Sequence, residues 1–359
     1  MRFSILISIS LLLFNSTSAQ QTLTATTPMV SPQASISQTV GITKIEVIYS
    51  RPAVNDRKVW GEVVRLSPEN DTNARPWRAG ANENTTISFS TDAFVGGKTI
   101  KAGQYGLHLI IRSNGIVECK FSTNYQSWGS YYYDESEVVA SVNTKWEDHA
   151  PTERLKYEFD SLTNESVQLS LNWGDKRIPI PIRVDVKATT LASLQQEIQN
   201  KHMINYMGPQ EAAAWCLRND TNLEQALGWA NYSISFVKVF SNLKTKAEIL
   251  KKTGKTEEAE KVMQEALSMG AVFEIHGYGR ELIEQDKKDE ALKIFLYNAK
   301  KHPNEWPVNY GVAKAYAAKA DYKTAIQYLN KSIKNNKQER RQTFLAQKLE
   351  QLKKGEDIN

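Results

Sequence analysis

Hydrophobic and polar residues alternate with a period of two in the first half of the chain. Within residues 154–160, Leu155, Tyr157 and Phe159 share one face, and charged residues occupy the other. Residues 167–173 and 178–186 show the same alternation. Such alternation is typical of strands that pack one face on a core and expose the other to water. The first half therefore predicts an antiparallel β domain.

Further segments predict strands of the same domain: 41–50, 85–90, 103–112, 115–122 and 138–146. The pair Asn114-Gly115 predicts a hairpin turn, because both residues tolerate the positive φ of a type I′ turn. The segment 92–100 predicts a second hairpin that turns at Gly96-Gly97. Together the segments give eight or nine strands without helical crossovers. This arrangement predicts an antiparallel β-sandwich or a flattened barrel.

The last predicted strand, residues 177–186, contains Pro179 and Pro181. Proline has no backbone N–H to donate to a neighbouring strand. We therefore expect this strand to run along an edge of its sheet.

The periodicity becomes helical after about residue 187. Ala226, Ala259, Ala291 and Ala325 each follow a short polar turn, at spacings of 33, 32 and 34 residues. This pattern resembles the tetratricopeptide repeat, a helix–turn–helix unit of about 34 residues in which small residues let helices pack closely. The repeats are degenerate, since Asp286 stands where glycine is usual. An ordinary helical bundle is the alternative, and the regular spacing argues against it.

The beginning of the chain has the order of a secretory leader. Arg2 precedes an apolar run over residues 5–14, and Thr17 and Ala19 suit the −3 and −1 positions of a cleavage site. A buried N-terminal helix is the alternative. The run is too short to span a membrane, and no later segment approaches about 18 apolar residues. We therefore expect an exported chain, periplasmic or extracellular, without a membrane span.

These observations predict an α+β protein of two domains. Residues 1–19 form a signal peptide, residues 20–186 the β domain, and residues 187–359 a tetratricopeptide-like helical solenoid. The net charge of +5 over 359 residues is mild, so nucleic-acid binding is not expected. The two cysteines, Cys119 and Cys216, fall in different domains and are expected to be buried thiols.

Several motifs of the first half also resemble a known family. They are "SPQASISQTVGITKIEVIYSRPAVNDRKVWG", "WRAGANENTTISFS", "AGQYGLHLI" and "WGSYYYDESEVV". Over about residues 28–186 the chain is similar to the domain of unknown function 2911. Members of that family are secreted proteins, mostly of Bacteroidetes-type bacteria, and several carry tetratricopeptide-like tails. The resemblance implies an exported β-rich domain and supplies no catalytic residue.

The stretch "PWRAGANENT", residues 76–85, is the first candidate site. One interpretation is a structural corner in which Arg51 or Arg78 pairs with Glu83 and Asn82 satisfies loop amides. Another is a polar pocket in which a guanidinium and an indole hold a carboxylate, a phosphate or a sugar. A third makes Glu83 a catalytic carboxylate. The candidate ligand-binding residues here are Arg51, Arg57, Trp60, Trp77, Arg78, Asn82 and Glu83.

The stretch "QSWGSYYYDESE", residues 126–137, is the second candidate site and adds Trp128 and Tyr131 to the ligand-binding residues. Aromatic side chains beside acids can stack on sugar rings. They can also be strand residues, with Tyr131 and Tyr133 pointing inward and Tyr132 outward. Packing is the favoured interpretation.

The sequence contains none of the common catalytic signatures G-x-S-x-G, H-E-x-x-H, the phosphate-binding loop or G-x-G-x-x-G. The five histidines are dispersed, and His108 on a strand is read as a satisfied histidine rather than a ligand. We therefore expect no catalytic residue, no metal and no cofactor. A pair of carboxylates far apart in the sequence stays open as a glycosidase arrangement.

These patterns favour an exported non-enzymatic binding or scaffold protein. The helical repeats are expected to recognise a protein partner, and the β domain is a candidate for holding a small polar ligand. The alternative is a carbohydrate-binding or carbohydrate-active protein that uses aromatic and acidic residues of the β domain. The candidate partner-binding residues are Trp215, Trp229, Tyr232, Tyr278, Arg280 and Tyr310.

Overall fold

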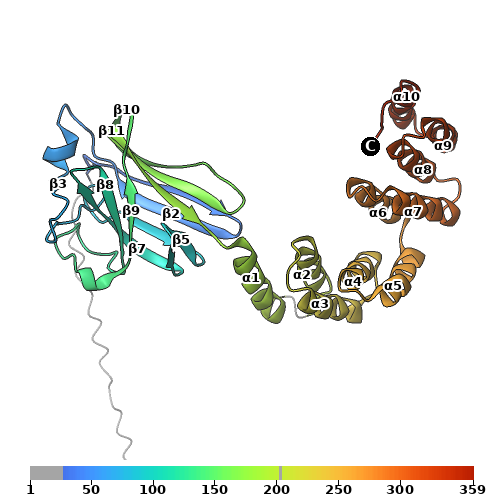
Figure 1. The fold of residues 1–359 in the computed structure, drawn as a ribbon, viewed down its shortest axis with the longest axis horizontal. Coiled ribbons are helices and arrows are strands. Elements are labelled where there is room, and N and C mark those ends of the chain that lie inside the picture. The colour runs from blue at the N-terminus through green and yellow to red at the C-terminus, as the bar shows by residue number, and fades with distance from the viewer. Residues whose placement is uncertain (1–26, 202–203) are drawn as a thin grey trace, which may run out of the picture. The chain divides into compact units, whose positions relative to one another are not determined.

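The computed structural model describes residues 27–201 and 204–359. The predicted leader, residues 1–19, lies outside them. The chain divides into two compact units with the boundary between Val184 and Asp185, two residues before the predicted domain boundary (Figure 1). Each unit has its own buried core and is described by itself.

The N-terminal unit contains two β-sheets. Its strands are β1 (Gln33–Val40), β2 (Thr43–Ser50), β3 (Leu66–Ser67), β4 (Thr86–Phe89), β5 (Ala93–Val95), β6 (Lys98–Ile100), β7 (Gly103–Arg112), β8 (Ile116–Ser122), β9 (Val138–Lys145), β10 (Glu147–Asp160) and β11 (Ser166–Arg183). One sheet has the order β1-β2-β4-β7-β8-β9, with β3 added in parallel to β7, and the other has the order β10-β11-β5-β6. The antiparallel β domain is confirmed, and the larger sheet does not close into a barrel.

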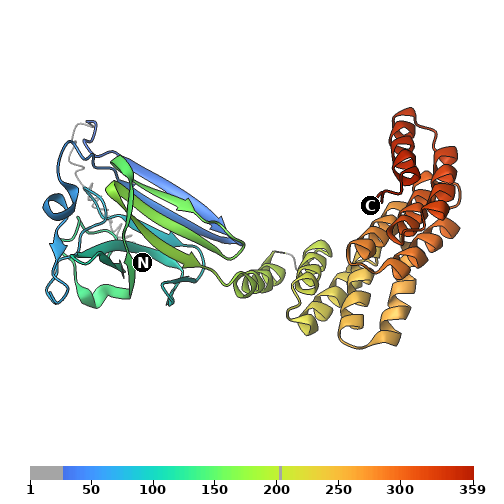
Figure 2. The ribbon, with the colours of Figure 1, turned by 45° about the horizontal axis from the view of Figure 1, so that its top comes forward.

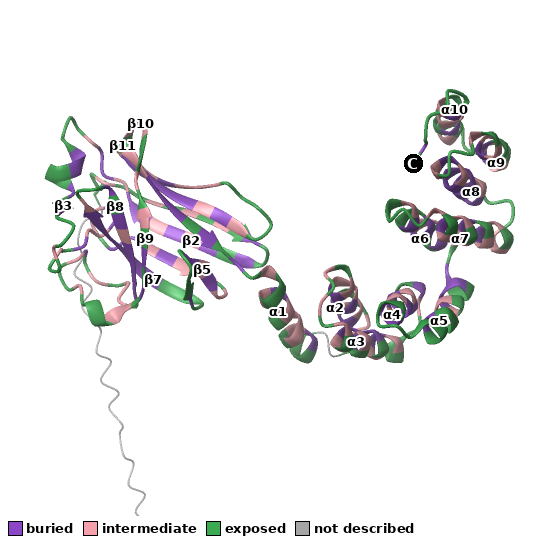
Figure 3. Ribbon diagram, viewed as in Figure 1, coloured by how far each residue is buried: buried purple, intermediate pink, exposed green. Residues whose placement is uncertain are grey.

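The buried faces of the two sheets meet in one core, coloured purple in Figure 3. Tyr49 of β2 touches Tyr157 of β10, with ring centroids 4.8 Å apart. Only Trp146 separates β9 from β10, so the chain passes from one sheet to the other at this residue. Cys119 is a free buried thiol in this core, as predicted, and Cys216 is one in the other unit.

The two prolines of β11 do not mark a sheet edge, because β11 lies between β10 and β5. The strand pairs with β10 through residues 168–177 and with β5 through Ile182 and Arg183. Pro179 and Pro181 fall between these two paired stretches, where the strand has no ladder to complete. The prediction of an edge strand was therefore wrong. The two prolines nevertheless occupy positions where no backbone N–H is needed for strand pairing.

Both predicted hairpins are present, with different turns. At Gly96-Gly97, φ is positive at both residues (52° and 81°), as a type I′ turn requires. At the β7–β8 turn only Gly115 has positive φ, and its N–H donates to the carbonyl of Arg112. The β7–β8 turn is therefore not of the predicted type I′.

The C-terminal unit is helical (Figures 1 and 2). Its described helices are α1 (Val186–Asn200), α2 (Met207–Arg218), α3 (Leu223–Phe236), α4 (Phe240–Lys252), α5 (Thr256–Met269), α6 (Val272–Glu284), α7 (Lys288–Lys301), α8 (Trp306–Ala318), α9 (Tyr322–Asn335) and α10 (Glu339–Lys353). Within the part of the chain that the structure describes, no helix is long and apolar enough to cross a membrane.

The helices pack as successive pairs, α2–α3, α4–α5, α6–α7 and α8–α9. The four repeated alanines are the fourth residues of α3, α5, α7 and α9, and all four are buried. The turns inside the pairs contain left-handed residues: Asp220 and Asn222 in the first, and Gly254, Asp286 and Ala320 in the other three. Asp286 thus takes the backbone conformation that glycine normally supplies. The predicted repeat solenoid is confirmed.

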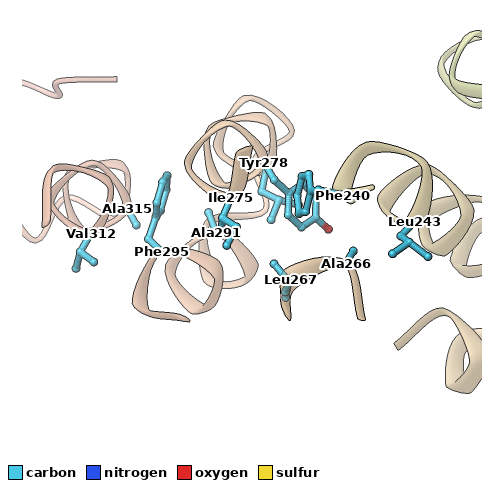
Figure 4. Packing of buried hydrophobic residues seen from close by; sticks show 11 residues of the cluster. Phe240, Leu243, Ala266, Leu267, Ile275, Tyr278, Ala291, Phe295, Val312 and Ala315 are labelled. Atoms are coloured by element: carbon cyan, nitrogen blue, oxygen red, sulfur yellow. The ribbon is translucent and has the colours of Figure 1, made fainter. Parts of the chain in front are cut away.

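Phe295 of α7 is a fully buried member of the hydrophobic cluster shown in Figure 4. A Cβ on Gly279 of α6 would lie 2.5 Å from Cζ of Phe295, and one on Gly311 of α8 would also overlap its ring. The ring of Phe295 meets His276 edge-on at 5.3 Å. The two glycines therefore allow α6 and α8 to approach the ring as closely as they do.

We predict that Gly279→Ala lowers the free energy of unfolding of the helical unit by about 1–3 kcal/mol, because the added methyl group overpacks a full core. Gly277→Ala in the same helix is the matched control, since a Cβ there meets nothing within 4 Å. That change should raise stability by about 0.5–1 kcal/mol, because alanine favours helix. Urea unfolding followed by the helical circular dichroism signal measures both. Equal effects of the two variants would contradict the conclusion that Gly279 is needed for close packing against the Phe295 ring.

Candidate functional site

The corner at residues 76–85 is held by backbone and hydroxyl hydrogen bonds. The N–H and carbonyl of Trp77 pair with Leu109 of β7 at 2.7 and 2.8 Å. Ala79 is buried with φ of +55°, and its carbonyl accepts from Thr85 Oγ1 at 3.0 Å and from the Tyr157 hydroxyl at 2.9 Å. A left-handed alanine is disfavoured on its own, so these bonds fix the corner against local strain.

The predicted ion pair of this corner does not form among the described residues. Arg78 donates through Nη1 to the Asn82 carbonyl, and Arg51 donates through Nε to the Leu155 carbonyl at 3.0 Å. Asn82 donates to the Ser31 carbonyl at 3.0 Å, so it ties the corner to the chain before β1. Glu83 is exposed. The structural-corner interpretation therefore holds in outline, with carbonyl groups in the place of the Glu83 carboxylate.

The tryptophans of the first candidate site pack in the core. Trp60 makes edge contacts with Trp77, Trp146 and Trp173, at centroid distances of 6.1, 5.4 and 6.3 Å. Trp77 and Trp173 are stacked at 5.9 Å. Trp60 is only 7% exposed, so the faces of its indole ring are used in packing. Its edge and Arg57 contribute to the wall of an open cavity of about 550 Å³.

A buried polar cluster lies under the second candidate site and holds its loop to the sheet. Lys120 of β8 is buried and pairs with Glu135 at 2.6 Å. Asn84 donates to Ser127 Oγ at 2.7 Å, and Nδ1 of His108 lies 3.1 Å from Ser130 Oγ. Sequence reasoning missed Asn84 and Lys120, because only the tertiary fold brings the loop over them.

The loop exposes its aromatic side chains. Trp128 is 51% exposed and Tyr131 is 79% exposed, with the Arg78 guanidinium 6.0 Å from the Tyr131 ring centroid. The strand interpretation of this segment was wrong, because residues 125–133 lie outside the strands. Tyr131 points to solvent instead of inward. Tyr133 is half-buried, and its ring centroid lies 5.1 Å from that of His108. Its hydroxyl donates to Glu135 Oε2 at 2.6 Å.

The candidate partner-binding residues of the helical unit fall into two groups. Trp229 belongs to the core beside Ala213 and Ile249, and Trp215 packs partly against the same cluster. Trp229 is therefore a packing residue, which corrects its assignment to a partner surface. Tyr232 packs against Phe236, with ring centroids 5.1 Å apart.

Of the other candidates of the helical unit, Arg280 is exposed, whereas Tyr278 and Tyr310 are as buried as Trp229. Tyr278 is mostly buried but lines two cavities, of about 850 and 1050 Å³, that also share Glu248 and Leu282. Tyr310 is largely buried and stacks on His276 at 6.2 Å, and Arg280 is exposed. Among residues 27–201 and 204–359, no group of three or more acidic, histidine or cysteine side chains is arranged to hold a metal ion.

Comparison with protein families assigns both units. Residues 31–182, which make up most of the β unit, match the family model described as "Protein of unknown function (DUF2911)". Residues 245–269, within α4 and α5, and residues 307–339, which cover α8 and α9, match the tetratricopeptide repeat. Both resemblances drawn from the sequence are thereby confirmed. No curated protein matches the chain.

Several solved structures are similar to part of the chain. A tetratricopeptide repeat protein from Parabacteroides merdae is 17% identical over 47% of this chain and 66% of its own, with a TM-score of 0.30. The C-terminal part of a tetratricopeptide repeat-containing protein from Cytophaga hutchinsonii is 13% identical over 46% of this chain and 66% of its own, with a TM-score of 0.30. YrrB, a tetratricopeptide repeat protein described as having an unusual peptide-binding site, is 16% identical over 46% of this chain and 83% of its own, with a TM-score of 0.27. Such low scores add nothing on what this chain binds.

We predict that the β unit loses stability as the pH falls from about 6.5 to about 4. Burial, and the Arg78 guanidinium nearby, lower the pKa of His108 from 6.5 to about 4. In that window the unfolded chain takes up a proton that the folded chain does not, so the free energy of unfolding falls by on the order of 1–3 kcal/mol.

Hydrogen exchange of the slowest β7 and β8 amides, measured across this window, tests the prediction and confines it to the β unit. The His108→Gln variant keeps a polar side chain that does not titrate, so its stability should change less with pH. An unchanged slope in this variant would assign the pH dependence to other groups.

Proposed function

We propose that the chain is an exported, non-enzymatic scaffold protein whose helical unit recognises a protein partner. The tetratricopeptide repeats support a role in protein interaction, because stacked helix pairs create an extended surface for binding. The observation that carries the proposal is the cavity of about 850 Å³, which is lined mostly by side chains of α2, α4 and α6. The lack of catalytic signatures in the sequence supports the non-enzymatic part.

Export is supported by the order of charge, apolar run and small residues over residues 1–19. If these residues are a leader, the exported chain begins at Gln20. Intact-mass measurement of the chain recovered from the periplasm or medium decides this, and a chain that retains Met1 would contradict it.

We predict that Ala214→Arg lowers capture of the partner at least about tenfold, because a long charged side chain enters the cavity that Ala214 lines. The exported chain serves as bait in cross-linking from the native host, with quantitative mass spectrometry. Ala188→Arg, at an exposed position of α1, is the control and should leave capture unchanged. If the two variants lose a protein equally, or neither recovers one, binding of a partner at this cavity is wrong.

A second candidate function is binding of a glycan or small polar ligand by the β unit. The observation that favours it is the exposed pair Trp128 and Tyr131, with Arg78 beside Tyr131. Their loop is fixed from beneath by the Lys120–Glu135 ion pair and by Asn84. Rigidly held aromatic rings can stack on a sugar without a large loss of conformational entropy on binding.

Screening the full chain on a glycan array and titrating any hit by calorimetry tests this function. Trp128→Ala should weaken binding at least about tenfold, since a stacked aromatic anchor often dominates affinity. Phe273→Ala removes an aromatic side chain of similar exposure from the helical unit, 60% against 51%, and should have no effect. A chain that binds no glycan, or binds equally after Trp128→Ala, would refute this second function.

A further inference from the structure

Four aromatic rings of α6, α8 and α10 form a connected group on the helical unit. Tyr310 is at its centre: it stacks on His276 and on Trp306, each at 6.2 Å, and meets Phe344 edge-on at 5.8 Å. Phe344 is 41% exposed. The group therefore continues from the buried core to solvent.

Cations lie over these rings. Lys314 is 5.5 Å from the Tyr310 centroid, Arg341 is 4.3 Å from that of Trp306, and Lys348 is 6.0 Å from that of Phe344. We call the four rings and these three cations the aromatic–cationic surface. Arg280, beside it, is 3.6 Å from Glu284. The three cations of the surface itself have no carboxylate within ion-pairing distance among the described residues.

Lys314 is the most unusual of these cations, because it is only 7% exposed. A buried ammonium group without a carboxylate is costly unless other groups compensate it. Burial, with Arg280 and Lys348 nearby, lowers the pKa of Lys314 to about 8, and Asp357 and Glu284 act in the opposite direction. The site is therefore suited to an anionic group.

Residues 355–359, which we call the tail segment, lie against Lys314. After α10, Gly355 takes a left-handed conformation, with φ of +77°, and the chain turns back towards α8. Lys314 Nζ donates to the Ile358 carbonyl at 3.4 Å, and Asn359 Nδ2 donates to the Lys314 carbonyl at 3.0 Å. Ile358 is 1% exposed and packs in the core cluster with Tyr310 and Leu345.

We propose that the aromatic–cationic surface binds an acidic and aliphatic peptide segment of the partner, and that residues 355–359 occupy the site as an internal ligand which that segment displaces. This inference rests on the proposed recognition of a protein by the helical unit. The tail segment displays the required chemistry: an acidic residue near Lys314, a buried aliphatic side chain and backbone hydrogen bonds to α8. The apolar pocket for Ile358 favours a peptide over a nucleic acid, which has no aliphatic side chain to fill it.

An internal ligand lowers the apparent affinity for an added peptide in proportion to the fraction of free sites. The probe is the fluorescein-labelled peptide Gly-Glu-Asp-Ile-Asn, titrated against the full chain by fluorescence anisotropy. Ile358→Ser should release the tail segment and tighten binding about tenfold if the tail segment occupies roughly nine-tenths of the sites. Adding Lys314→Met to this variant should abolish the gain.

Lys331→Met is the matched control, because Lys331 also lies over a tyrosine ring, 4.5 Å from the Tyr328 centroid, but on α9. It should leave binding unchanged. The charge-reversed peptide Gly-Lys-Lys-Ile-Asn should not bind. Equal binding of both peptides, or no binding to a folded Ile358→Ser chain, would overturn the inference.

A second measurement covers the case in which Ile358→Ser unfolds α10. Saturating peptide added to the unmodified chain should speed hydrogen exchange at residues 355–359, and unchanged exchange would overturn displacement. Lys314-dependent binding of a uridine oligonucleotide would overturn the inference in favour of nucleic acid. A failure here is separate from a failure of the proposed function, since capture that depends on Ala214 uses the cavity at α2, α4 and α6.

Discussion

The helical unit depends on the close approach of three helices around the Phe295 ring. Gly279 and Gly311 leave room for that ring, and no larger residue fits at either position without displacing it. The contact also extends outwards, because Phe295 meets His276, which in turn stacks on Tyr310. The spacing of α6 and α8 that satisfies the core thus sets the positions of the rings that reach the surface. Packing and recognition are linked through one side chain.

The β unit is organised around buried polar groups instead. The left-handed Ala79 is fixed by two hydroxyl donors, and Lys120 is compensated by Glu135. Each of these groups has a hydrogen-bond partner, which offsets part of the cost of burying it in this core. The Lys120–Glu135 pair thereby ties to the sheet the loop that presents Trp128 and Tyr131 to solvent.

Periodic features of the fold were predictable from sequence, and tertiary pairings were not. The repeated alanines located four helix pairs, because each must sit in a crowded helix contact. The prolines of β11 misled, since a long strand can pair with different neighbours at its two ends and leave a gap between them. β1 was missed because its sequence QASISQTV is largely polar and pairs at the edge next to β2. No local signal marks Lys120 or Asn84, whose partners lie more than a dozen residues away.

The two units handle buried charge differently, and the difference separates structural from binding groups. In the β unit, buried Lys120 already has its carboxylate, so a ligand would have to break an existing ion pair to reach it. In the helical unit, buried Lys314 has a carbonyl at 3.4 Å in place of a carboxylate. A carbonyl compensates an ammonium group less than a carboxylate does, because it carries no net charge. An arriving anion therefore gains more at Lys314 than at Lys120, and the helical unit is the better place to look for a charged partner.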